Sequence, residues 1–276
     1  MSFEFPRTIE KSNIESIPLE VGGTEIVLQR HGKYERSVES ENVGSLTPDG
    51  AKEISEMSRG FFKTLIESIP EEERKDLKIL VVASDTQFRG GGRRSMETAR
   101  KVMEAAKEQL GEFGMNEDQV INKAGRLKGE GGPRPTADLR EPQMFDNSPE
   151  FVNFLKEKYG DMGKDFWVAF EDDAEKETRE KMGAEGPDEI TNRLKHVVAV
   201  LNRYSRMYHS KYPNKRLVIW AATHYDTISP FVKREIFDVS KETPLAVDYG
   251  AGISIKVNPD GNLTTKVAGK EYNLEI

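Results

Sequence analysis

Three short apolar runs constrain the fold of this chain more than any other feature of its sequence. Residues 25–29 (EIVLQ), 78–83 (KILVVA) and 217–222 (LVIWAA) are apolar and rich in β-branched side chains, and polar or charged residues follow each of them. Runs of this length and composition are typical of strands that are buried on both faces of a sheet. A sheet buried on both faces needs helices on each side, so the sequence predicts an α/β protein.

The segments between these runs have helical periodicity. Thr47 and Pro48 are typical of a helix cap and first turn, and apolar residues then recur every three or four positions in a helix that stops before Pro70. Ser95 is expected to cap a second helix, and a third is expected over residues 188–208. This alternation predicts a three-layer sandwich, with a mainly parallel central sheet and helices on both faces.

The chain from about residue 125 to 187 differs in texture from the rest. It contains the loop-like GEGGPRP, a short predicted helix with Ser148 as its cap, and the acidic run EDDAEKETRE, which we expect to be a solvated face. We expect an insertion that forms a lid over the strand ends, within a single domain of residues 1–276. Further along, ISIKV, NPDG and NLTTKV predict a hairpin at the sheet edge.

The composition argues against several classes of protein. Charged residues make up 32% of the chain and no apolar run approaches about 18 residues, so we expect no membrane span. A net charge of −7 opposes binding to nucleic acid, because phosphate backbones attract basic surfaces. The chain has no cysteine, which excludes disulfides, thiolate catalysis and thiolate metal sites. The N-terminal residues lack a signal-peptide pattern, and we expect a cytoplasmic protein.

Unusual polar residues follow each of the three predicted strands. Arg30 and His31 come directly after the first, Arg94 follows the second in a glycine-rich segment, and His224 follows the third. Ligands of open α/β sheets bind at the carboxyl ends of the strands, where the connecting loops converge. The sequence therefore predicts that these four residues share one site.

Together these motifs resemble a known family. RHG after a first strand, LTPDG at a helix start, SD followed by RSMETA, and a late histidine after an apolar strand resemble, in this order, the histidine phosphatase superfamily. The resemblance covers roughly residues 24–105 and 215–258, and it does not cover the insertion. It implies the phosphoglycerate mutase-like fold and phosphoryl transfer through a phosphohistidine, with neither a metal nor another cofactor.

The resemblance also implies a role for each residue of the predicted site. His31 would be the nucleophile, and His224 would face it across the phosphate. Arg30 and Arg94 would bind the phosphate, because arginines are permanently charged and donate paired hydrogen bonds to its oxygens. Gly32 would let the backbone approach without a side chain in the way.

The sequence leaves two assignments open. The proton donor could be Glu141, in an LxE-like segment, or Asp226, which lies two residues after the late histidine rather than directly after it. We favour Glu141, because a carboxyl group on a lid can combine a raised pKa with reach to the substrate. The extra residues FRGGG before RSMETA also leave Arg93 or Arg89 as alternative phosphate ligands.

The predicted activity is metal-independent hydrolysis of a phosphomonoester, on a small phosphorylated substrate or a phosphopeptide. Two alternatives are a phosphoglycerate-mutase-like phosphotransferase and a catalytically silent relative that binds a phosphorylated ligand or a protein. Tyr34 and Ser37 differ from the residues that the branches of the family carry there, so the sequence does not name a substrate. Four histidines without an HExxH pair disfavour a zinc hydrolase. The oligomeric state stays open.

Overall fold

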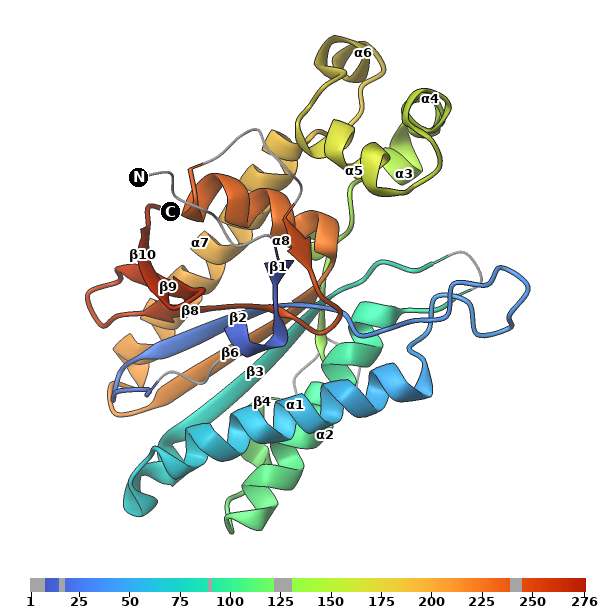
Figure 1. The fold of residues 1–276 in the computed structure, drawn as a ribbon. Helices are drawn as coiled ribbons and strands as arrows, with labels where there is room; N and C mark the ends of the chain where they lie inside the picture. The colour runs from blue at the N-terminus through green and yellow to red at the C-terminus, as the bar shows by residue number, and fades with distance from the viewer. Residues whose placement is uncertain (1–7, 15–17, 89–90, 122–130, 239–244) are drawn as a thin grey trace.

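The computed structural model describes residues 8–14, 18–88, 91–121, 131–238 and 245–276 (Figure 1). Among these residues the central sheet has eight strands, in the order β10-β9-β8-β2-β6-β3-β4, with β5 paired to β3. Its strands are β2 (Thr24–Arg30), β3 (Leu77–Ser84), β4 (Val120–Ile121), β5 (Arg134–Thr136), β6 (Arg216–Thr223), β8 (Gly252–Val257), β9 (Leu263–Val267) and β10 (Lys270–Leu274). A separate parallel pair consists of β1 (Thr8–Ile9) and β7 (Ala246–Val247).

The sheet is parallel on one side and antiparallel on the other. Strand β6 pairs in parallel with both β2 and β3, whereas β8, β9 and β10 continue the sheet beyond β2 with antiparallel pairing. The predicted hairpin is formed by β8 and β9, but its position at the edge was wrong. It lies inside the sheet, because β8 pairs with β2 and the short polar strand β10 covers β9.

Helices cover both faces of this sheet, as Figure 1 shows. Helices α1 (Pro48–Glu67) and α2 (Arg94–Glu112) pack on one face, and α7 (Pro187–Lys211) and α8 (Tyr225–Phe231) pack on the other. Successive residues of β6 alternate between the two cores, so that Trp220 packs on the α1–α2 side and Ile219 on the α7–α8 side. The predicted three-layer α/β sandwich is confirmed, with a mixed sheet.

The predicted helix starts differ in their outcomes. Thr47 caps α1, because its Oγ1 accepts the N–H of Gly50 at 3.0 Å. The prediction for Ser95 was wrong, because α2 begins one residue earlier, at Arg94. The Glu97 carboxylate instead accepts the N–H of Arg93 at 3.3 Å. The Ser95 side chain is buried.

The first residues of the predicted insertion, 125–130, lie outside the described ranges. Its described part contains β5, the 3-10 helix η4 (Ala137–Leu139) and four short α-helices. Figure 1 shows the four short α-helices gathered beyond the α7–α8 layer. Phe151, Leu155, Phe166 and Phe170 form a small apolar core of their own with Ile190 of α7. The helices are α3 (Met144–Asn147), α4 (Pro149–Tyr159), α5 (Lys164–Glu171) and α6 (Lys176–Lys181). The division into one domain with an inserted lid stays a prediction.

Two side chains of the insertion differ from expectation. Ser148 stands at the N-cap position of α4, but its hydroxyl donates to the carbonyl oxygen of Met182 at 3.2 Å rather than capping the helix. The acidic run is not wholly solvated, because its first residue, Glu171, is 1% exposed. Its carboxylate lies 3.3 Å from Lys233 Nζ. Lys233 belongs to a π-helical segment, η5 (Val232–Ile236), that continues α8.

The remaining short elements connect these parts. They are the 3-10 helices η1 (Lys11–Asn13), η2 (Glu71–Asp76), η3 (Glu117–Gln119) and η4 (Ala137–Leu139). No helix within the described ranges is both long and apolar enough to cross a membrane.

The strand register brings the loops of the predicted site together. Arg30 is paired with Thr223 across β2 and β6, and Ala83 is paired with Ala222 across β3 and β6. The carboxyl ends of these three strands therefore lie at one level. His31 directly follows β2 and His224 directly follows β6, so both histidines start from that level.

Candidate active site

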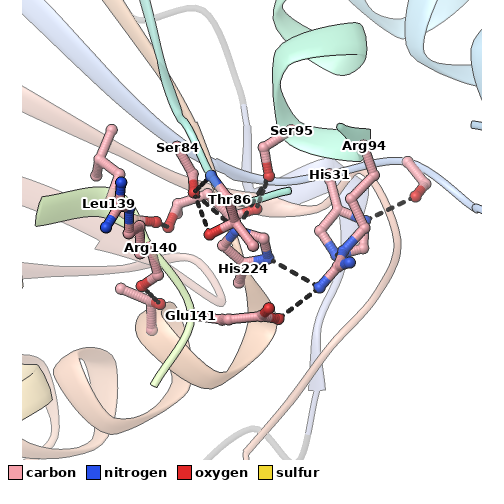
Figure 2. A network of polar contacts seen from close by, with 12 residues as sticks. His31, Ser84, Thr86, Arg94, Ser95, Leu139, Arg140, Glu141 and His224 are labelled. Carbon is pink, nitrogen blue, oxygen red and sulfur yellow. Dashed lines mark hydrogen bonds and ion pairs between the residues drawn. The ribbon is translucent and has the colours of Figure 1, made fainter. Parts of the chain in front are cut away.

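His31 leaves the end of β2 with its ring in a defined tautomer. Its backbone N–H donates to the carbonyl oxygen of Thr223 at 3.0 Å, which fixes the chain. Its Nδ1 lies 2.9 Å from the carbonyl oxygen of Gly32, and a carbonyl oxygen only accepts, so Nδ1 carries the hydrogen. Arg94 Nε donates to the other ring nitrogen, Nε2, at 3.0 Å (Figure 2). Both contacts select a neutral imidazole that carries its hydrogen on Nδ1 and accepts through the electron pair of Nε2.

Gly32 lies where the chain passes the start of α1. Its N–H donates to Thr98 Oγ1 at 3.0 Å. A Cβ at this position would lie 2.9 Å from Ile54 Cγ1 and 3.2 Å from the carbonyl oxygen of Gly50. Close packing against α1 thus requires glycine here, and the predicted approach of its backbone to a phosphate stays a prediction.

Arg94 connects three of the predicted site residues. It is the first residue of α2, its side chain is 6% exposed, and besides His31 it contacts Glu141 and His224 (Figure 2). Its Nη2 lies 2.6 Å from Glu141 Oε2 and 3.4 Å from His224 Nδ1. Arg93 is exposed, and its guanidinium bonds to Gln87 at 3.3 Å. The alternative ligand Arg89 lies outside the described residues.

His224 follows β6 and faces His31, with ring centroids 5.3 Å apart. Arg94 can only donate, so His224 Nδ1 accepts from it and Nε2 carries the hydrogen. That Nε2 lies 2.9 Å from Ser84 Oγ and 3.3 Å from Ser95 Oγ. The two serines orient the ring.

Burial and charge hold both histidines in their neutral form. Removal from water lowers the pKa of His31 and of His224 well below the ordinary value, and the positive charge of Arg94 lowers both further. Each ring is therefore neutral at pH 7. For His31 this leaves an unprotonated nitrogen that can form a bond.

The carboxyl groups of Glu141 and Asp226 both lie close enough to Arg94 to interact with its charge. Burial raises the pKa of Glu141, against the attraction of its Arg94 partner. Burial, followed by the nearby Glu141 charge, raises the pKa of Asp226 to about 7. Asp226 Oδ1 is buried and has no hydrogen-bond partner among the described residues. Among all residues that the structure describes, no group of three histidine, aspartate or glutamate side chains is arranged to hold a metal ion.

Comparison with known proteins identifies the architecture. No family model and no curated protein matches the sequence significantly. Among solved structures, a phosphoglycerate mutase from Bacillus anthracis superposes with a TM-score of 0.52 at 16% identity, over 92% of this chain and 95% of the mutase. The chain has the phosphoglycerate mutase-like fold. This confirms the fold that the sequence motifs implied.

Two further solved structures overlap with the phosphoglycerate mutase-like fold of this chain at lower scores. A mycobacterial glucosyl-3-phosphoglycerate phosphatase covers 92% of this chain and 100% of its own, at 14% identity and a TM-score of 0.44. Bacillus stearothermophilus YhfR covers 90% and 97%, at 19% identity and a TM-score of 0.48. We draw the fold from the mutase alone.

On this phosphoglycerate mutase-like scaffold, the LxE-like segment is held from several sides. Arg193 of α7 donates to the carbonyl oxygen of Arg140 at 2.8 Å, and Thr223 Oγ1 donates to that of Leu139 at 2.7 Å. Asp85 binds the Arg140 guanidinium through two hydrogen bonds, of 2.6 and 2.9 Å. Sequence reasoning missed Arg193, because nothing in a helical pattern distinguishes an arginine that reaches a distant carbonyl.

The Arg30 guanidinium turns away from the two histidines, to which it makes no hydrogen bond among the described residues. Its Nη1 donates to the carbonyl oxygen of Val247, and its Cζ lies 3.8 Å from the ring centroid of Tyr249 and 5.4 Å from that of Tyr225. Its charge still lowers the pKa of both histidines. Its role as a phosphate ligand stays a prediction.

Aromatic rings form one wall of the site. The Tyr34 and Tyr249 centroids lie 5.1 and 5.9 Å from that of His31, and Arg94 Cζ lies 4.6 Å from the Tyr34 ring. Tyr34 was visible in the sequence as a departure from the family pattern. Tyr249 carried no such signal, because it lies in a loop without a recognisable motif.

Proposed function

We propose that this protein is a histidine phosphatase that hydrolyses phosphomonoesters without a metal, through a phosphohistidine at His31. One observation carries the proposal: Nε2 of His31 is held as a neutral acceptor beside the buried guanidinium of Arg94. Attack on a phosphate needs a nucleophile with a free electron pair and cations around the phosphate oxygens. The site supplies both at hydrogen-bond distance.

In the first step, the phosphate enters beside Arg94, whose guanidinium then donates to its oxygens and releases the electron pair of His31 Nε2. His31 Nε2 forms a bond to phosphorus as the bond to the leaving oxygen breaks. The negative charge of the phosphate raises the pKa of His224, so that its Nδ1 acquires a proton and donates to the phosphate oxygens. Losing one such donor costs about 10²- to 10³-fold in rate.

Glu141 donates the proton that the leaving oxygen needs. It contacts Arg94 directly, so its carboxyl group reaches the phosphate-binding position. Asp226 lies close enough that the two carboxyl groups influence each other's proton affinity. In the second step, water attacks the phosphohistidine, the Glu141 carboxylate accepts its proton, and inorganic phosphate leaves with His31 restored.

The similarity of fold supports this proposal, since the structure that superposes with a TM-score of 0.52 is named as a phosphoglycerate mutase. We expect the substrate to be a small phosphorylated molecule or a phosphopeptide. With a net charge of −7, we expect neither nucleic acid nor a membrane as partner, and we expect the protein to act in the cytoplasm.

The test measures hydrolysis of p-nitrophenyl phosphate in EDTA by the wild type, by His31→Ala and by His196→Ala, a control on an exposed histidine of α7. We expect EDTA-resistant turnover that falls on the order of 10³-fold or more in His31→Ala alone. Protein quenched during turnover of a ³²P-labelled substrate should carry label that acid releases and alkali does not. Equal activity of His31→Ala and wild type would overturn the proposal, and transfer of the label to a bound product would indicate a mutase.

A further inference from the structure

A cavity of about 390 Å³ is lined in part by residues adjacent in sequence to the two histidines. It is connected to them through the chain, because Arg30 precedes His31 and Tyr225 follows His224. Its volume falls within the roughly 300–1,000 Å³ of small-molecule sites. The lining comes from α5, from the start of α8 and from β7 with its next residue, and includes Arg30, Lys164, Trp167, Tyr225, Val247 and Asp248.

We propose that this cavity, the leaving-group pocket, binds the part of the substrate that departs from phosphorus, and that this part is a planar ring with an anionic substituent. The inference rests on the proposed function and specifies its substrate class. It concerns residues to which the phosphohistidine mechanism gives no role, except for Arg30 at the boundary of the two sites.

The walls of the leaving-group pocket favour a flat apolar group. The Trp167 and Tyr225 rings meet edge to face, with centroids 5.7 Å apart and planes at 87°. The Tyr225 hydroxyl donates to buried Glu171 at 2.6 Å, which fixes that ring. Rigid aromatic side chains offer a large contact area to a planar ligand at little cost in conformational entropy.

The charges of the leaving-group pocket favour an anion. Lys164 and Arg30 provide two positive charges against the one negative charge of Asp248. Lys164 is exposed at the start of α5 and forms no ion pair with any described residue. Arg30 Nε is buried and has no hydrogen-bond partner in the described parts of the chain. A carboxylate or second phosphate on the ring would bind these two donors.

The position of Arg30 separates the two sites. Its guanidinium stacks on Tyr249, which itself lies 5.9 Å from the His31 ring. A phosphate on His31 and a ring beside Trp167 would therefore lie on either side of one arginine. Esters with a ring directly on the phosphate oxygen should fit better than long flexible ones.

The experiment compares 4-(carboxymethyl)phenyl phosphate with 4-ethylphenyl phosphate, which are similar in size and in the basicity of the phenolate. In the wild type we expect the carboxylate to raise kcat/KM about fivefold or more, the size of a partly exposed ion pair. Lys164→Met should remove this preference, so that the ratio of the two kcat/KM values falls to about one. Lys181→Met, on an exposed lysine of the neighbouring helix α6, should keep it.

Binding supplies a readout that does not depend on turnover. The chain has two tryptophans, of which Trp220 is fully buried, so quenching by an added ligand reports on Trp167. We expect 4-(carboxymethyl)phenyl phosphate to quench His31→Ala at lower concentration than the ethyl compound does, and Lys164→Met to abolish the difference. This result without hydrolysis in the wild type would refute the proposed function and support the pocket. Hydrolysis that depends on His31, with no preference and no effect of Lys164→Met, would overturn the pocket alone.

Discussion

Arg94 organises the site at the scale of single residues, because one buried guanidinium contacts both histidines and a carboxylate. The Glu141 carboxylate pairs with the guanidinium to which the proposed mechanism assigns the phosphate. Binding of the phosphate would free Glu141 from this ion pair, and a carboxyl group beside a phosphate dianion binds a proton more strongly. Glu141 would thus become protonated as the substrate arrives.

Replacing this acid should matter most for poor leaving groups. Glu141→Gln should lower kcat/KM about 10²- to 10³-fold for an alkyl phosphate, because its alkoxide needs the proton, and less than tenfold for p-nitrophenyl phosphate, whose phenolate does not. Asp226→Asn, a matched change in the neighbouring carboxyl group, should affect both substrates to the same extent. The reverse pattern would assign the proton donor to Asp226.

The neutral histidines predict how the site responds to pH. The ring resonances of His31 and His224, assigned in NMR spectra by His31→Ala and His224→Ala, should not titrate between pH 8 and pH 6.5, because the pKa of each is lowered by burial and Arg94. Unfolded histidine has a pKa of about 6.5, so the unfolded state binds more protons below that pH. These two rings therefore make folding less favourable as the pH falls below about 6.5. A titration midpoint at or above 6.5 would contradict this assignment.

At the scale of elements, the start of α1 is fitted to the loop after His31. A Cβ on Gly50 would lie 2.3 Å from the carbonyl oxygen of Lys33, whereas a Cβ on Gly60 of the same helix would have no atom within 4 Å. The first glycine is thus required by contact between two backbones. The second is not required by packing.

This contrast gives a matched pair of substitutions. Gly50→Ala should lower the free energy of unfolding by about 1–3 kcal/mol, because the helix start must move away from the loop. Gly60→Ala should raise it by about 0.5–1 kcal/mol, because alanine loses less backbone freedom in a helix. Urea unfolding followed by circular dichroism measures both, and equal shifts of the same sign would refute the contact.

The elements also show how far sequence reasoning reaches. The three apolar runs, the Thr47 cap and the convergence of His31, Arg94 and His224 were predictable, because periodicity and strand ends are local signals. The direction of Arg30 was not, since it depends on an aromatic ring in a distant loop. Strand β10 was missed because only one of its five residues is buried, so its polar sequence carries no apolar pattern.

At the scale of the whole molecule, a buried ion pair connects the insertion to the sandwich. Glu171 is the last residue of α5, and Lys233 lies in η5, the segment that continues α8. Their side chains are 1% and 2% exposed. Ser229 also donates to Glu171, at 3.0 Å. The insertion is therefore attached through charges that water does not reach, close to the leaving-group pocket.

Removing one partner should reveal the strength of this attachment. Lys233→Met should lower the free energy of unfolding by about 3–5 kcal/mol at pH 7, because it leaves Glu171 charged and buried. Burial already raises the pKa of Glu171, so the loss should shrink as the pH falls and the carboxyl group is protonated. Lys158→Met, which breaks an exposed pair with Glu175, should cost at most about 1 kcal/mol. Glu171→Gln in the Lys233→Met background should restore part of the loss, and a pH-independent loss would exclude this explanation.

The strand order has a consequence for the newly synthesised chain. Strand β6 lies between β2 and β3, yet it follows both in the sequence, so the centre of the sheet is missing until the ribosome has made most of the protein. Until then, β2 and β3 expose apolar surface without the neighbour that joins them. His31 cannot lie next to His224 before β6 has paired between β2 and β3. The phosphoryl transfer proposed here therefore cannot begin in the nascent chain before β6 pairs with β2 and β3.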